Sequence, residues 1–162
     1  MIRVYADSKA EPIRCTNRRR GIWRITWDYR EIETPEGVQR SYMEETFDHK
    51  PTPEEVRTVV TGWYNEQTDR AILCGFSYEN IPVWLSGENQ FNYKAAYDLA
   101  VQSGGKSLPV TFKFGTDETP RYRTFEKLEE LTDFYTKAMR HVQDVLADGW
   151  RKKDSFNIEV YR

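Results

Sequence analysis

The 162-residue sequence has only two cysteines and two histidines, and it has no long apolar run. Its longest apolar stretches, Ala71 to Cys74 and Ile81 to Leu85, fall far short of the ~20 residues of a membrane-spanning helix. An apolar signal segment and an Asn-x-Ser/Thr site are also lacking, so we expect neither membrane insertion nor export. Because Cys15 and Cys74 lie far apart, we expect reduced thiols in a cytoplasm.

The scarcity of histidine also limits the chemistry that can be expected. His49 and His141 stand in no His-x-x-x-His or Cys/His spacing, so a zinc site has little support. The segment Gly75-Phe-Ser77 begins like a hydrolase nucleophile elbow but lacks the closing glycine, and it predicts a strand entry. We therefore predict no metal, no cofactor and no catalytic residue, and we expect a protein that is not an enzyme.

Neither sign of charge dominates, because 24 Lys and Arg are opposed by 26 Asp and Glu. Cations are concentrated in residues 1–30, where Arg18, Arg19 and Arg20 form a basic run. Basic patches that bind nucleic acid are usually recognised at about five to eight residues. A solvated loop before a strand is the favoured interpretation, and nucleic acid is not the expected partner.

Aromatic residues, by contrast, are abundant at 14% of the chain. Such side chains bury large areas, and a chain of this length can build a core without metal or disulfide. We expect a soluble globular protein with a single domain over residues 1–162.

The first half of the sequence predicts a β-hairpin followed by a helix. Alternation in residues 22–30 places Trp23, Ile25, Trp27 and Tyr29 on one face of a strand. A turn at 34–37 joins it to a second strand at about 38–48. Residues 52–55 have the capping pattern of a helix start, and Gly75 can end that helix.

The second half predicts a strand over 76–85, a helix over 88–103, a hairpin with strands at 108–115 and 121–123, and a long helix. We expect Thr124 to cap this last helix and Gly149 to end it. The complete order predicts an α+β fold, with a mostly antiparallel sheet that has hairpins and is covered by about three helices.

One segment resembles a phosphate-binding loop, since Ala100 to Ser107 reads AVQSGGKS. The chemistry of such a loop requires a strand before it and a helix after it. Here a helix precedes the glycines and a strand follows. Gly104 and Gly105 are therefore expected to end the helix, and Lys106 to be a solvated turn residue.

Two carboxamides, Asn89 and Gln90, open the inward face of the predicted helix over 88–103. Buried amides need hydrogen-bond partners, and the favoured interpretation is that they bind backbone groups. The alternative is a small-ligand binder or a hydrolase, with a binding site formed by Trp84, Asn89, Gln90 and Asn92.

The long C-terminal helix has an apolar band that Phe134, Met139 and Leu146 widen. Covering the sheet of its own domain is the favoured role of this band. The alternative is contact with another chain, which would make the protein a homo-oligomer.

Several segments between residues 47 and 154 resemble a domain family of bacteriophage and prophage proteins that has no known function and is often associated with tail or tail-fibre assembly genes. These segments are 47–52 (FDHKPT), 82–100 (PVWLSGENQFNYKAAYDLA), 108–115 (LPVTFKFG), the helix over 124–141, and 149–154 (GWRKKD). The family contributes no catalytic residues, and the hairpin at about 22–48 lies largely outside the similarity.

The resemblance implies a non-enzymatic phage structural or assembly protein that acts through protein–protein contacts. The implied partner is a phage tail or assembly protein. The implied location is the cytoplasm of a bacterial host, with the virion as the other expected place.

Overall fold

The computed structural model describes residues 1–6, 10–35 and 37–162. The chain divides into two compact units, which we call unit 1 (Met1–Trp63 with Ser155–Arg162) and unit 2 (Tyr64–Asp154). Helix α1 (Pro53–Cys74) contributes its first half to unit 1 and its second half to unit 2. The expectation of a single domain stays a prediction.

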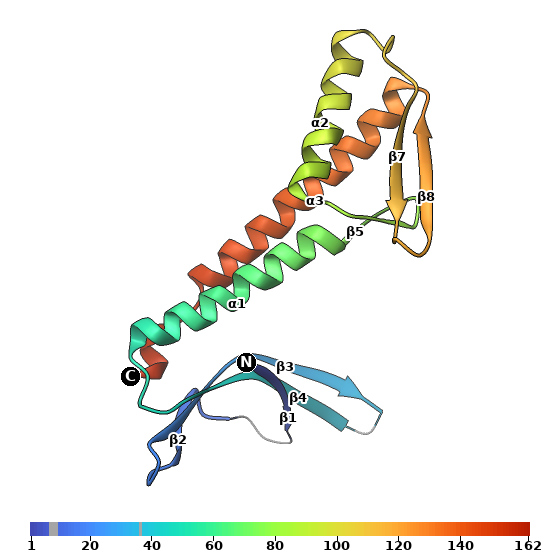
Figure 1. Cartoon of the computed structure of the whole chain (residues 1–162). Coiled ribbons are helices and arrows are strands. Elements are labelled where there is room, and N and C mark those ends of the chain that lie inside the picture. Colours follow the sequence, from blue (N-terminus) through green and yellow to red (C-terminus); the bar gives the residue numbers. More distant parts are fainter. Residues whose placement is uncertain (7–9, 36) are drawn as a thin grey trace. The chain divides into compact units, whose positions relative to one another are not determined.

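Unit 1 contains an antiparallel sheet with the strand order β1-β4-β3-β2 (Figure 1). Its strands are β1 (Ile2–Ala6), β2 (Ile13–Asn17), β3 (Ile22–Thr34) and β4 (Gly37–Phe47). The predicted hairpin is confirmed as β3 and β4, although Glu36 of its predicted turn lies outside the described residues. Sequence alternation did not predict β1 and β2, which have five residues each.

One face of this sheet is buried by the first half of α1. Ile25, Val56 and Val60 are completely buried, and the rings of Trp27 and Trp63 meet edge to face with centroids 6.2 Å apart. The alternation along β3 thus places Ile25 and Trp27 on this face. It does not extend to Tyr29, which is 37% exposed, because the pairing with β4 is irregular between Trp27 and Arg30.

The sheet also binds the C-terminal segment of the chain. Its 3-10 turn (Ile158–Tyr161) buries Tyr161, whose hydroxyl donates a hydrogen bond of 2.7 Å to the backbone oxygen of Thr26. This buried aromatic ring makes the C-terminal segment part of unit 1.

Unit 2 combines helices with two short hairpins. In chain order its elements are the second half of α1, β5 (Phe76–Tyr78), β6 (Ile81–Val83), α2 (Gly87–Gln102), β7 (Val110–Gly115), β8 (Pro120–Phe125) and α3 (Leu128–Asp154). Strand β5 pairs with β6 and β7 with β8, both antiparallel. The α+β class is confirmed, but the described strands form separate sheets rather than one.

Two predicted boundaries in unit 2 were wrong. The strand expected over 76–85 is a hairpin, because Glu79 and Asn80 adopt positive φ values of 51° and 62° and reverse the chain. The long helix begins at Leu128, since Thr124 still belongs to β8, and it continues through Gly149 to Asp154. Gly149 therefore does not end the helix.

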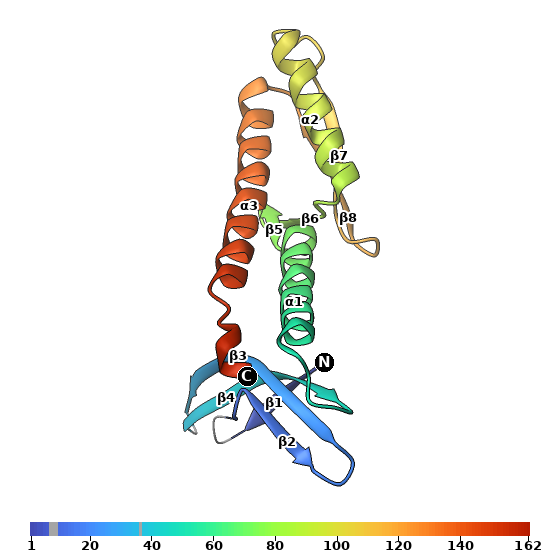
Figure 2. The ribbon, with the colours of Figure 1, turned by 90° about the vertical axis from the view of Figure 1, so that its left-hand side faces the viewer.

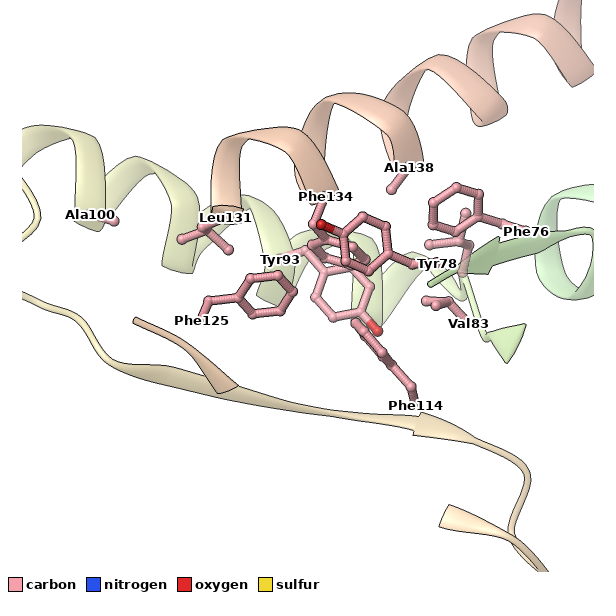
Figure 3. Close-up of a cluster of buried hydrophobic side chains, with 11 residues drawn as sticks. Phe76, Tyr78, Val83, Tyr93, Ala100, Phe114, Phe125, Leu131, Phe134 and Ala138 are labelled. Carbon is pink, nitrogen blue, oxygen red and sulfur yellow. The ribbon is translucent and has the colours of Figure 1, made fainter. Parts of the chain in front are cut away.

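The core of unit 2 is built around Phe134 of α3 (Figure 3). Its ring centroid lies 5.0 to 5.3 Å from those of Tyr78, Tyr93, Phe114 and Phe125, which come from β5, α2, β7 and β8. The apolar band of α3 thus turns Phe134 toward its own core, as the favoured interpretation expected. None of the helices in the described ranges is both long and apolar enough to cross a membrane.

Candidate functional site

A cleft of about 590 Å³ opens in unit 2. It lies within the size range of roughly 300–1,000 Å³ that is typical of small-molecule sites. Its lining residues come from the end of α1, from β6 and the segment after it, from the start of α2, and from β7 and the turn after it: Leu73, Cys74, Pro82, Val83, Trp84, Asn89, Lys113, Phe114, Gly115, Thr116 and Asp117. The lining is mainly apolar, with a few polar groups at the rim.

The segment between β6 and α2 determines how Trp84 is presented. Its neighbours Val83 and Leu85 are buried, and the backbone N–H of Leu85 donates a 3.1 Å hydrogen bond to the carbonyl of Leu73. In an extended segment, alternate side chains point in opposite directions. Trp84 consequently faces outward and keeps 51% of its surface exposed.

Asn89 and Gln90 hold this segment in place. The side-chain Nδ2 of Asn89 donates a hydrogen bond to the backbone oxygen of Trp84, and the side-chain Nε2 of Gln90 donates one to the backbone oxygen of Leu85, each over 2.8 Å. Ser86 caps the helix, because its hydroxyl accepts a bond from the Asn89 N–H over 3.2 Å. The interpretation that the two carboxamides bind backbone groups is confirmed.

The structure thus brings together only part of the predicted site. Trp84 and Asn89 line the cleft, whereas Gln90 and Asn92 are not among its lining residues. Asn92 is exposed on α2. Residues that the sequence did not indicate complete the lining, notably Lys113 and Asp117, whose charged groups are 3.3 Å apart.

The cleft offers binding contacts rather than a nucleophile and a base. Cys74 is an exposed free thiol, and no histidine is among the described residues of the lining. His141 is used elsewhere in unit 2, where its Nε2 lies 3.0 Å from the carbonyl oxygen of Ala71 and its ring contacts Phe76. Within the part of the chain that the structure describes, no group of three or more His, Cys, Asp and Glu could hold a metal ion.

Burial affects two tyrosines of the unit 2 core. Removal from water raises the pKa of Tyr78 to about 12, and the hydrogen bond of 3.0 Å that its hydroxyl donates to Asp133 acts in the same direction. Burial alone raises the pKa of Tyr93 to about 12. Both rings belong to the buried core of unit 2.

The segment that resembles a phosphate loop has the predicted helix-to-strand order. Helix α2 ends at Gln102, and Gly104 and Gly105 follow with positive φ values of 58° and 84°. Lys106 is exposed in the turn. The glycines thus end a helix, as expected.

The outer face of α2 is a second candidate for binding. Phe91 and Leu99 are 70% and 57% exposed, and Ala95 lies between them, so that residues four apart form one apolar stripe. The inner face carries the buried Tyr93 and Ala100. We call Phe91, Ala95 and Leu99 the outer stripe. The outer stripe was not predicted, although its spacing of four residues is present in the sequence.

No protein-family model, no curated protein and no solved structure matches the chain. The geometry of these residues is therefore the basis on which a function can be proposed.

Proposed function

We propose that the chain is a non-enzymatic structural or assembly protein of a bacteriophage or prophage, possessing a protein–protein contact surface on α2. The observation that carries this proposal is the outer stripe. An exposed phenylalanine and leucine on one helix face are costly to leave in water, and apolar patches of this kind mark interaction sites. The resemblance to tail-associated sequences supports the phage context.

The occupant we propose for the outer stripe is a second copy of this chain. A two-fold axis at Ala95 would pack two α2 helices antiparallel, with Phe91 of one copy against Leu99 of the other. The small Ala95 side chains would meet at the crossing and allow close approach. Glu88 would face Gln102, so no like charges would oppose each other along the stripe.

Sedimentation velocity over a range of protein concentrations tests this contact. A surface confined to one helix face is at the small end of stable interfaces, so we expect a dimer that dissociates at micromolar concentration. Ala95→Arg places a charge at the crossing and should give a monomer with an unchanged melting temperature. Tyr122→Glu, at a residue of β8 that is 72% exposed, is the matched control and should leave the dimer intact.

A wild-type monomer at all concentrations would contradict the proposed contact. The phage context has a separate test, which is the identity of the genes that neighbour this one. Tail or assembly genes support it, and an operon of metabolic enzymes contradicts it.

The cleft supports a second candidate function, a small-ligand binder with Trp84 and Asn89 in its site. Trp84 can stack on a planar ligand, since a large part of its ring is exposed at the rim of an apolar cleft. A thermal-shift screen tests this, because a ligand at 100 times its dissociation constant stabilises a fold by about 2.7 kcal/mol. A true hit should lose its effect in Trp84→Ala and protect Cys74 from alkylation.

A further inference from the structure

The hairpin formed by β2 and β3 in unit 1 is strongly basic. Between Ile13 and Ile25 the sequence contains five arginines and no acidic residue. Three of them, Arg18 to Arg20, occupy the turn that joins the two strands, which projects from the sheet (Figure 2). The other two, Arg14 and Arg24, lie on the strands.

The three arginines of the turn are available to a partner. All are exposed, and their side chains make no hydrogen bond or ion pair with any residue that the structure describes. The turn itself is well defined, since the side chain of Asn17 accepts a 3.1 Å bond from the backbone N–H of Arg20 and Gly21 takes a positive φ of 67°. Its cations are therefore presented on a fixed backbone.

The two arginines on the strands share a single buried carboxylate. Arg14 and Arg24 are directly opposite each other, and their guanidinium groups lie 3.3 and 2.9 Å from Glu44 of β4. Glu44 is only 4% exposed, whereas Arg14 and Arg24 keep 37% and 40% of their side chains in contact with solvent. One carboxylate balances one of these two cations, so the hairpin keeps a large positive excess.

We propose that the β2–β3 hairpin binds the phosphate backbone of duplex nucleic acid. The sequence shows a run of three cations, but the fold adds Arg14 and Arg24 to the same ribbon and reaches the size of a basic patch. Guanidinium groups match the geometry of phosphate oxygens, and the major groove of duplex DNA admits a two-stranded β-ribbon. The exposed acid Asp48, whose backbone lies beside Gly21 of the turn, is hydrogen-bonded to His49.

Fluorescence anisotropy of a labelled 20-base-pair duplex, titrated at a series of salt concentrations, tests the proposal. The affinity should fall steeply with salt, with a logarithmic slope of roughly −0.9 for each phosphate contacted. Arg18→Ala, Arg19→Ala and Arg20→Ala combined should weaken binding at least tenfold at low salt and reduce the slope by about 2 to 3. This variant removes only exposed turn residues, so its melting temperature should not change.

The matched control combines Lys106→Ala, Lys127→Ala and Arg140→Ala, which removes the same charge from exposed positions of unit 2. It should bind the duplex like the wild type. Equal weakening in both variants, or no binding by the wild type at low salt, would overturn the proposal. A competition experiment gives a further test. If polyglutamate displaces the labelled duplex as strongly as unlabelled duplex of equal charge does, the hairpin recognises acidic polypeptide and the proposal is overturned.

Discussion

Gly149 of α3 lies directly against Thr68 of α1, and the space for a side chain at position 149 is already filled. A Cβ built on Gly149 would be 2.3 Å from Oγ1 of Thr68 and 3.1 Å from its Cγ2. The Thr68 hydroxyl is itself held, since it donates a 2.8 Å hydrogen bond to the backbone oxygen of Tyr64. The glycine therefore permits two helices of unit 2 to approach closely.

Gly149→Ala should destabilise the protein by about 1 to 3 kcal/mol, the usual cost of overpacking, even though alanine favours a helix. Thermal or urea unfolding measures this. Thr68→Ala combined with Gly149→Ala should recover much of the loss, because the clashing atoms are removed. Gly62→Ala is the control: nothing lies within 4 Å of its added Cβ, and it should stabilise α1 by up to ~1 kcal/mol.

A second prediction concerns the two carboxamides that hold the segment before α2. Gln90→Ala should cost about 1 to 1.5 kcal/mol and Asn89→Ala about half of that, because the Asn89 bond is more exposed to water. The neighbouring exposed Asn92→Ala should change the free energy of unfolding by less than about 0.5 kcal/mol. Loss of the dimer or of a ligand by Asn89→Ala without loss of stability would instead indicate a binding role.

Local signals were sufficient to predict much of the fold. The capping pattern at residues 52–55 corresponds to observed bonds, in which the Thr52 N–H donates to Glu55 over 2.8 Å and the Glu55 N–H donates to Thr52 over 3.3 Å. The alternation in β3 and the start of α2 were equally informative. These features depend on residues that are only a few positions apart in the chain, so they can be recognised from the sequence alone.

The errors arise where tertiary contacts override local preference. Glycine is common just after the end of a helix, which is why Gly149 was predicted to end α3. In the structure it lies inside the helix, because Thr68 of α1 fills the space that a side chain at position 149 would need. The cleft was only half predicted for a similar reason. Lys113 and Asp117 are far from Trp84 in sequence, and only the positions of β6 and β7 bring them to the same lining.

A third prediction follows from His49 in unit 1. Its ring nitrogens lie 2.8 Å from a carboxylate oxygen of Asp48 and 3.0 Å from one of Glu55. The hydrogen bond with Asp48, followed by that with Glu55, raises the pKa of His49. A raised pKa stabilises the fold below the ordinary value of 6.5, and this contribution is lost as pH rises through the folded value.

At low pH, protonation of Asp48 and Glu55 ends the stabilisation that this cluster gives to the fold. The bond with His49 lowers the pKa of Asp48, and the Thr52 N–H lowers that of Glu55, so their contribution is lost as pH falls below their ordinary values of 3.8 and 4.5. The cluster should therefore stabilise unit 1 most between about pH 4.5 and 6.5. An NMR titration should place the His49 midpoint above 6.5, and Asp48→Asn should lower it. Glu54→Gln, at a neighbour that makes no bond to the ring, should leave it unchanged.

The last prediction concerns Glu44, which is 4% exposed and bound by Arg14 and Arg24. Because two cations serve one carboxylate, removing either one leaves the other in place. Arg14→Gln and Arg24→Gln should each cost less than about 1 kcal/mol, within the range of partly exposed ion pairs.

The double variant should behave differently, because it leaves a buried carboxylate without a cation. It should lose about 3 to 5 kcal/mol, far more than the sum of the single variants, and a double-mutant cycle by urea unfolding measures this coupling. Glu44→Gln should cost an intermediate amount, since Arg14 and Arg24 are directly opposite and would then repel each other without a compensating charge. High salt should reduce that repulsion and part of the loss. If the free-energy losses of the two arginine variants are additive, water solvates the Glu44 carboxylate when a guanidinium is removed, and the second arginine does not compensate.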